Sequence, residues 1–148
     1  MLWEAWERVR ANRGAAGVDR VTLADVEEYG VARMLGELQD DLRAGRYRPA
    51  PVRRVDIPKP QGGKRPLGVP TIRDRVAQQA AKLVLEPLFE ADFLPVSFGF
   101  RPKRSATQAM ERLRTGFIEG RVFVVEFDIV NFFGEIDHDR LLAEVGRR

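Results

Sequence analysis

The sequence contains no cysteine and a single histidine, His138. Disulfide bonds, thiolate nucleophiles and cysteine-ligated zinc are therefore excluded, and so is a metal held by a cluster of histidines. The chain also lacks a run of about 18 apolar residues, and its Met1 end has no basic-then-apolar signal pattern. We expect a cytoplasmic protein that does not contact a membrane.

The composition is otherwise that of an ordinary globular protein, with 44% hydrophobic and 32% charged residues in a chain of 148. That length is enough for one domain with a buried core. The net charge of +3 is small but unevenly distributed, because ten Lys and Arg lie between Arg43 and Arg75, against two acids. Clustered charge focuses the electrostatic potential, so this segment is the candidate surface for an anionic partner.

Apolar residues recur at helical spacing in six places, several of them preceded by residues that cap helices. Helices are expected over 1–11, from Thr22, over 31–44, from 71 to about 86, where Pro87 ends or kinks the helix, from Ser105 to about 119, and over 138–145 after Asp137.

Two further stretches have the pattern of β-strands. Val55 and Ile57 share one face, a turn is expected at Gln61-Gly62-Gly63, and apolar residues alternate with others from Arg65 to Val69, which together predict a hairpin. The nearly continuous apolar run 122–129 predicts a central strand buried on both faces. The fold class is therefore α+β.

Asp128 is the sharpest chemical candidate, because it stands at the end of that predicted strand. A buried carboxylate is costly unless it is paired or bound to a metal. At a solvent-open sheet edge it suits Mg²⁺, which prefers hard oxygen donors and substrate phosphates. Two-metal nucleotidyl transfer needs at least two such carboxylates. The alternative is an aspartate that merely starts a turn.

Several motifs together resemble the opening motifs of a bacterial group II intron reverse transcriptase/maturase, in the family's order and approximate spacing over nearly all of the chain. They are Asn12–Asp19, Tyr47-Arg48-Pro49, Ile57–Pro60 with Gly62–Arg75, Ser97–Pro102, and Phe127–Phe133 through Ile136-Asp137-His138. The resemblance implies a helix-rich fingers subdomain with an amino-terminal extension over 1–95, containing the hairpin. Residues 96–148 would then be the first strand and helix of a polymerase palm, truncated.

The resemblance also implies roles for particular residues. Lys59 and Arg65 match positions that contact the triphosphate of the incoming dNTP, which suits a lysine point charge beside a forked guanidinium. Asp128 matches the first catalytic aspartate, and Ile129 would lend its backbone carbonyl to a metal. Phe132 or Phe133 would exclude a 2′-hydroxyl from the sugar site. The alternative is that both rings pack in the core, as one of them is expected to do. Spacing does not distinguish the two rings.

Contacts to the RNA template are implied for six cations, although charges on the outer face of a hairpin also serve solubility alone. They are Arg53, Arg54, Lys64, Arg73, Arg75 and Arg101. The loop 97–102 resembles the family's template-strand and palm-lining loop, against an alternative of plain helix packing. Trp3 and Trp6 are expected to pack rather than to stack on RNA bases.

The family's aromatic-Ala-Asp-Asp segment, which supplies the other catalytic carboxylates, is not in this sequence. Its one Asp-Asp pair, Asp40-Asp41, lies in a helical pattern and is expected on a solvated face. Where the family commonly has an acid after the Phe-Phe pair, Gly134 stands here and bears on local order. The two-metal Mg²⁺ site is then incomplete, and we expect no polymerisation by this chain alone.

The first functional hypothesis is thus the amino-terminal part of an RNA-directed DNA polymerase. Its partners would be intron RNA or an RNA template with DNA primer, dNTP and the missing carboxy-terminal half. The alternative is a non-catalytic module that binds intron RNA and assists splicing. A third possibility is a decayed gene remnant or an excised fragment without a function of its own. Uncovered apolar surface also favours a homodimer.

Overall fold

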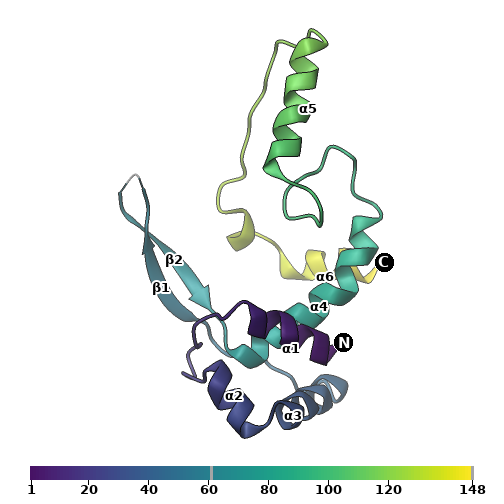
Figure 1. Ribbon diagram of the computed structural model, residues 1–148. Helices are drawn as coiled ribbons and strands as arrows, with labels where there is room; N and C mark the ends of the chain where they lie inside the picture. Colours follow the sequence, from purple (N-terminus) through teal and green to yellow (C-terminus); the bar gives the residue numbers. More distant parts are fainter. Residues whose placement is uncertain (61, 148) are drawn as a thin grey trace. The chain divides into compact units, whose positions relative to one another are not determined.

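The computed structural model describes residues 1–60 and 62–147 (Figure 1). The chain divides into two compact units, Met1–Pro87 and Leu88–Arg148. Gln61, which belongs to the predicted turn of the hairpin, lies outside the described residues. The expected division into fingers over 1–95 and palm over 96–148 stays a prediction.

The first unit begins with three helices, α1 (Leu2–Ala11), α2 (Leu23–Tyr29) and α3 (Val31–Arg43). Thr22 caps α2 in a reciprocal capping box: its hydroxyl accepts from the Asp25 N–H, and the Asp25 carboxylate accepts from the Thr22 N–H at 2.8 Å. The helices predicted at these places are confirmed.

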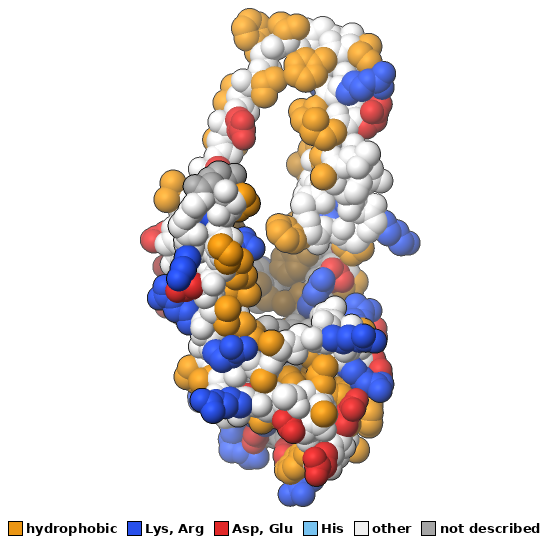
Figure 2. Space-filling model, turned by 60° about the vertical axis from the view of Figure 1, so that its left-hand side comes forward, with side chains coloured by type: hydrophobic (Ala, Val, Ile, Leu, Met, Phe, Trp, Pro, Cys, Tyr) orange, Lys and Arg blue, Asp and Glu red, His pale blue; other side chains and the backbone are white. Residues whose placement is uncertain are grey.

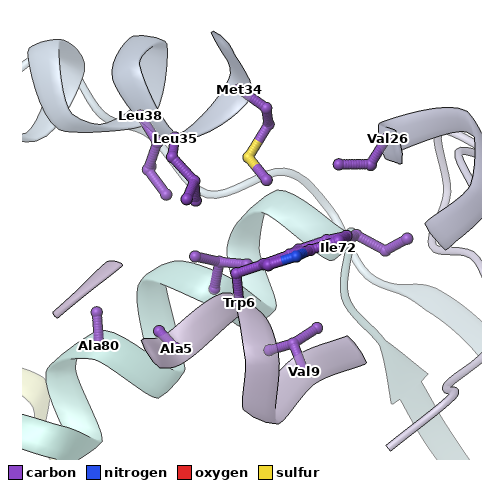
Figure 3. Close-up of a cluster of buried hydrophobic side chains, with 10 residues drawn as sticks. Ala5, Trp6, Val9, Val26, Met34, Leu35, Leu38, Ile72 and Ala80 are labelled. Carbon is purple, nitrogen blue, oxygen red and sulfur yellow. The ribbon is translucent and has the colours of Figure 1, made fainter. Parts of the chain in front are cut away.

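The core of this unit forms around the indole of Trp6, which is 2% exposed. Side chains from α1, α2, α3 and α4 (Ile72–Glu90) converge on it (Figure 3). They are Ala5, Val9, Val26, Met34, Leu35, Leu38, Ile72, Val76 and Ala80. Trp3, on the same helix, is 55% exposed. The expectation that both tryptophans pack is therefore confirmed for Trp6, whereas Trp3 is packed only in part.

The hairpin consists of β1 (Arg53–Pro58) and β2 (Lys64–Val69), paired antiparallel (Figure 1). In their register Arg53 lies opposite Val69 and Pro58 opposite Lys64. On β1 every second residue, beginning with Arg53, is half-buried, and the residues between are exposed. The predicted hairpin is confirmed; the alternation holds for β1, whereas in β2 every residue except Val69 is exposed.

The long helix α4 runs through Pro87 to Glu90, so Pro87 does not end it near residue 86; that Pro87 kinks the helix stays a prediction. A proline removes only one N–H donor from the helical ladder, and a helix with good neighbours on both sides can continue past it. Pro87 is nevertheless the last residue of the first unit.

The second unit contains α5 (Ala106–Ile118), a short 3₁₀ turn (Phe132–Gly134) and α6 (His138–Gly146). Ser105 and Gln108 form a second capping box at the start of α5, and the Asp137 side chain caps α6 by accepting from the Arg140 N–H. Both helices were predicted at these positions from the capping residues and are confirmed.

The segment 122–129 is not a strand in the structure, which corrects the expectation of a buried central strand. Among the described residues β1 and β2 form the one sheet, so this segment has no strand to pair with. Its side chains are exposed, Phe123 at 95% and Phe127 at 87%. A strand is stabilised by pairing and by cross-strand side chains, and an apolar sequence alone does not form one. The α+β fold class holds through the helices and the hairpin.

An apolar groove of about 550 Å³ separates this segment from α5. Figure 2 shows orange side chains projecting from both of its walls. The wall on α5 includes Leu113 and Phe117, and the opposite wall includes Phe123 and Val125. Within the part of the chain that the structure describes, no helix is both long and apolar enough to cross a membrane.

Candidate nucleotide- and nucleic-acid-binding site

Lys59 and Arg65 occupy the same face of the hairpin near its turn. Arg65 lies directly opposite Ile57, and Lys59 follows Ile57 by two residues. The ladder extends to Lys59, whose N–H donates to the Gly63 carbonyl at 3.0 Å. Because opposed residues and residues two apart share a face of a sheet, the two cationic side chains are neighbours on one side of the hairpin.

Lys64 projects from the opposite face, because it is paired with Pro58. Lys59, Lys64 and Arg65 are all exposed, and among the described residues none of the three has a side-chain hydrogen bond or an ion pair. Their charges are therefore available to an anionic ligand. The structure thus brings two of the predicted dNTP-binding residues together in one patch.

The other basic residues near the hairpin have partners within the protein. Arg54 pairs with Asp56 on its own strand at 3.1 Å. Arg73 pairs with Asp41 at 2.7 Å, and its guanidinium carbon lies 5.8 Å from the centre of the Tyr47 ring. The predicted role of these arginines in template binding stays a prediction, with Arg54 the more exposed of the two.

Asp41 is half-buried rather than fully solvated, which corrects part of the expectation for Asp40-Asp41. Hydrogen bonds from Arg73, and then from Arg46, hold the pKa of its carboxyl below the ordinary value. Both aspartates lie within α3, as the helical pattern predicted.

Arg53 and Arg75 donate to backbone carbonyls instead of carboxylates. Arg53 donates from Nε and Nη2 to the Ala16 carbonyl at 3.0 and 2.8 Å. Arg75 donates from the same two nitrogens to the Pro70 carbonyl at 3.1 and 2.9 Å, and from Nη2 to the Ala15 carbonyl. Their predicted contacts to RNA stay predictions, although both guanidinium groups are already engaged.

Arg101 organises the loop that follows α4. Its side chain is 5% exposed, and its guanidinium pairs with Glu90 at 2.7 Å and donates to the carbonyls of Leu94 and Ser97 at 2.8 and 2.9 Å. The Phe93 ring centre lies 5.0 Å from it. The hydrogen bonds to Glu90 raise the pKa of Arg101 and lower that of Glu90. This side chain has little surface left for a template strand.

Asp128 is exposed in the extended segment, and one of its carboxylate oxygens accepts from the N–H of Ile129 at 3.0 Å. Carboxylate and carbonyl oxygens are the donors that Mg²⁺ prefers. Within residues 1–60 and 62–147, however, no group of three or more His, Cys, Asp or Glu side chains is placed to hold a metal. The residues present therefore fit at most one part of a magnesium site.

The rings of Phe132 and Phe133 meet edge to face, with centroids 5.2 Å apart and an angle of 69° between their planes. Phe132 is 47% exposed and Phe133 82%. The turn that carries them starts at Asn131, whose backbone is left-handed (φ 50°) and whose side-chain amide donates to Glu135 at 3.0 Å. A Cβ at Gly134 would lie 2.5 Å from that amide nitrogen, so the glycine at this position leaves room for the Asn131 side chain.

A buried hydrogen-bond network around Asp74, next to the hairpin, was not predicted from the sequence. Asp74 is 4% exposed and accepts hydrogen bonds from the hydroxyls of Tyr47 and Thr71, both at 2.6 Å, and from the Ala50 N–H at 3.1 Å. Burial, and then the bond to Asp74, raise the pKa of Tyr47 to about 12. The sequence signal was slight, because Asp74 stands between two arginines and looks like part of a solvated charge run.

Comparison with known proteins identifies the family. The family model described as reverse transcriptase (RNA-dependent DNA polymerase) matches residues 57–147. The chain therefore belongs to the reverse transcriptase family. This assignment agrees with a basic hairpin followed by an exposed Asp128 and a pair of aromatic rings.

The relatives narrow the assignment to the group II intron reverse transcriptase/maturases. The chain is 38% identical to the group II intron-encoded protein LtrA of Lactococcus lactis subsp. cremoris, over 97% of this chain and 24% of LtrA. It is 40% identical to protein YkfC of Escherichia coli (strain K12), over 99% of this chain and 40% of YkfC. A third relative is nuclear intron maturase 1, mitochondrial, of Arabidopsis thaliana, 33% identical over 47% of this chain and 10% of that protein. The chain thus spans less than half the length of these relatives.

Proposed function

We propose that this chain is the amino-terminal part of an RNA-directed DNA polymerase of the group II intron-encoded type, and that its hairpin binds the triphosphate of the incoming dNTP. The observation that carries the proposal is that two cations without partners among residues 1–60 and 62–147, Lys59 and Arg65, lie on one face of the hairpin. A forked guanidinium beside a point-charged ammonium can hold several phosphate oxygens at once.

Separate roles are proposed for residues of the second unit. Asp128 would hold Mg²⁺ through its carboxylate with the Ile129 carbonyl, and Phe132 or Phe133 would exclude a 2′-hydroxyl from the sugar site. The metal would stabilise charge on the reacting phosphate. The exposure of Asp128 and of both rings supports these roles, because groups that contact a ligand must be accessible.

The RNA template is proposed to lie along the hairpin, with Lys64 and Arg54 as its most accessible contacts. Lys64 has no partner among the described residues, and Arg54 pairs only with the half-exposed Asp56. Surface pairs of this kind are worth about 0–1 kcal/mol, so a phosphate can displace them. Arg73 and Arg101 would first have to give up their internal partners.

Binding of a dNTP to the 148-residue chain tests the proposed triphosphate site at Lys59 and Arg65. We expect Lys59→Gln and Arg65→Gln each to weaken binding of dATP with Mg²⁺ by about tenfold, the equivalent of one charge-assisted contact. The matched control is Arg33→Gln, which removes the same charge from an exposed i,i+4 pair on α3. Equal weakening by all three variants would indicate a non-specific charge effect and would count against the proposed triphosphate site.

Primer extension on an RNA template with Mg²⁺ tests the prediction that the chain alone is inactive. One candidate carboxylate, Asp128, is present in the motif, and two-metal transfer requires more than one. We expect no template-dependent product. Product that disappears in Asp128→Ala would sink this prediction and would assign catalysis to the fragment itself.

The alternative function is that of a module that binds intron RNA and assists splicing without polymerisation. The concentration of Lys and Arg between Arg43 and Arg75 favours it, because phosphate contacts supply salt-dependent RNA affinity. Charge reversal at Arg54 and Lys64 should weaken such a module, whereas Lys59→Gln and Arg65→Gln should leave dNTP binding unchanged if the alternative is correct.

A further inference from the structure

The hairpin is held to the body of the first unit by very few polar contacts. Within the described residues of Met1–Pro87, the only side-chain hydrogen bonds that join β1 or β2 to the rest of the unit are those of Arg53 to the Ala16 carbonyl. Arg53 is the first residue of β1, so these bonds act at the root of the hairpin, far along the strand from Lys59.

Arg75 donates to the carbonyl of Ala15, the residue before Ala16. Its guanidinium bridges the carbonyls of Pro70, just before α4, and Ala15. Residues 15 and 16 are thus fixed by two guanidinium groups, one from the hairpin and one from the first turn of α4. Fork-shaped guanidinium groups are suited to this task because they present several donors in one rigid plane.

Two glycines show how closely the segment is seated. Gly17 is buried, and a Cβ there would lie 2.6 Å from the Cα of Thr71 and 2.7 Å from its nitrogen. A Cβ at Gly14 would lie 2.6 Å from Nη1 of Arg75. A backbone neighbour cannot yield as a flexible side chain can, so any residue larger than glycine at position 17 must push the segment away from α4.

We propose that Arg53 and Arg75 are positioning residues: by gripping the carbonyls of Ala16 and Ala15 they clamp the segment 14–17 between the hairpin and α4. The clamp fixes the direction in which the hairpin presents Lys59 and Arg65. A direct role of these two arginines in RNA binding is the competing assignment, and the two make opposite predictions.

The functional importance of the clamp rests on the proposed binding of the triphosphate by Lys59 and Arg65. The first test needs neither nucleotide nor RNA, so its result does not depend on that proposed function. Hydrogen exchange of the free chain is measured for Arg53→Gln, Arg75→Gln and Gly17→Ala. We expect amides of residues 14–20 to exchange at least about tenfold faster in all three variants. The matched control is Arg54→Gln, which removes the neighbouring charge without touching the clamp. Unchanged exchange in the three variants would overturn the proposal.

The second test separates positioning from direct contact. A primer–template with RNA template is titrated over a series of salt concentrations. If Arg53 contacts a phosphate of the RNA, Arg53→Gln should lower the slope of log affinity for the primer–template against log salt by about one unit. If Arg53 instead positions the hairpin, that slope should stay unchanged, and a separate titration with dATP should show weaker binding at Lys59 and Arg65. A reduced slope in Arg53→Gln with normal exchange of residues 14–20 would assign Arg53 to the RNA instead.

Arg53→Lys is the further variant that keeps the proposal testable if a glutamine variant does not fold. Lysine retains the charge but cannot direct two nitrogens of one plane at the Ala16 carbonyl. We expect faster exchange of residues 14–20 with an unaltered salt slope. Full restoration of wild-type exchange by lysine would show that charge alone matters and would contradict the clamp.

Discussion

The hydroxyl of Tyr47 donates a 2.6 Å hydrogen bond to Asp74, a residue 27 positions further along the chain. Asp74 is almost fully buried, and the Thr71 hydroxyl and the Ala50 N–H donate to the same carboxylate. A buried carboxylate is tolerated when several donors surround it. Tyr47 and Ala50 lie in the chain entering the hairpin, so their two bonds fasten that chain to the first turn of α4, while the bond from Thr71 is local to the start of the helix.

Replacing Asp74 by Ala should therefore strongly destabilise the first unit. The change leaves the hydroxyls of Tyr47 and Thr71 and the Ala50 N–H without their acceptor, at an expected cost on the order of 3 kcal/mol. Urea unfolding followed by tryptophan fluorescence measures it. Tyr47→Phe removes one donor only and should cost about 1–2 kcal/mol. Equal stability of Asp74→Ala and wild type would contradict the structural role of this network.

Tyr47 should make stability depend on alkaline pH. Its pKa is raised to about 12, by burial first and then by Asp74. The neutral phenol is favoured in the folded state, so its contribution is fully present below the ordinary pKa of about 10 and is lost as pH rises through about 12. A spectrophotometric titration in a Tyr29→Phe background isolates Tyr47. An ordinary tyrosine titration there would contradict the raised pKa of Tyr47.

Glu90 should give the second unit a dependence on acidic pH. Hydrogen bonds from Arg101 lower its pKa below the ordinary 4.5. The stabilising contribution of the carboxylate is present above that value and is lost as pH falls through the lower, folded-state pKa. We expect the loop 91–101 to become sensitive to an acid-tolerant protease such as pepsin in that range. In Glu90→Gln the loop should already be cleaved at higher pH, and equal cleavage of both proteins would refute the interpretation.

The elements that the sequence predicted well are those whose signals are local. The capping boxes at Thr22 and Ser105 consist of residues three apart, and both helices begin where these residues place them. The hairpin was likewise predictable, because its two strands are joined by a short glycine turn and alternate regularly. Such patterns require no knowledge of the rest of the fold.

The errors concern residues whose environment is set by distant parts of the chain. The run 122–129 has strand-like composition but no partner strand among the described residues, so it stays unpaired. The internal partners of several arginines were also not evident from the sequence, although the predicted contacts of these arginines to RNA stay predictions. Arg101 and Arg75 have partners 7 and 60 residues away, whereas Lys59 and Arg65 have none among the described residues, and composition does not reveal the difference.

The exposed segment 122–129 should make the chain self-associate, which is consistent with the homodimer expected from the sequence. An extended apolar segment with unpaired backbone groups is prone to pair with another strand, and its face of Phe123, Val125 and Phe127 is open to solvent. We expect concentration-dependent sedimentation that Val125→Lys suppresses. Leu94→Lys, which places the same charge on another exposed apolar residue, should not suppress it. A chain that sediments as a monomer at every concentration would remove this prediction.

Trp6 and Trp3 offer a matched comparison within one helix, because the same substitution removes an indole from the core in one case and from the surface in the other. Trp6 is 2% exposed and lies among side chains from four helices, so Trp6→Ala should cost about 3–5 kcal/mol of unfolding free energy through the cavity it leaves. Trp3 is 55% exposed, so Trp3→Ala should cost only about 1 kcal/mol or less. Urea unfolding followed by circular dichroism measures both without relying on either indole as the probe. Similar losses in the two variants would mean that the surface of α1 around Trp3 is covered in solution, and the assignment of the core to Trp6 alone would have to be abandoned.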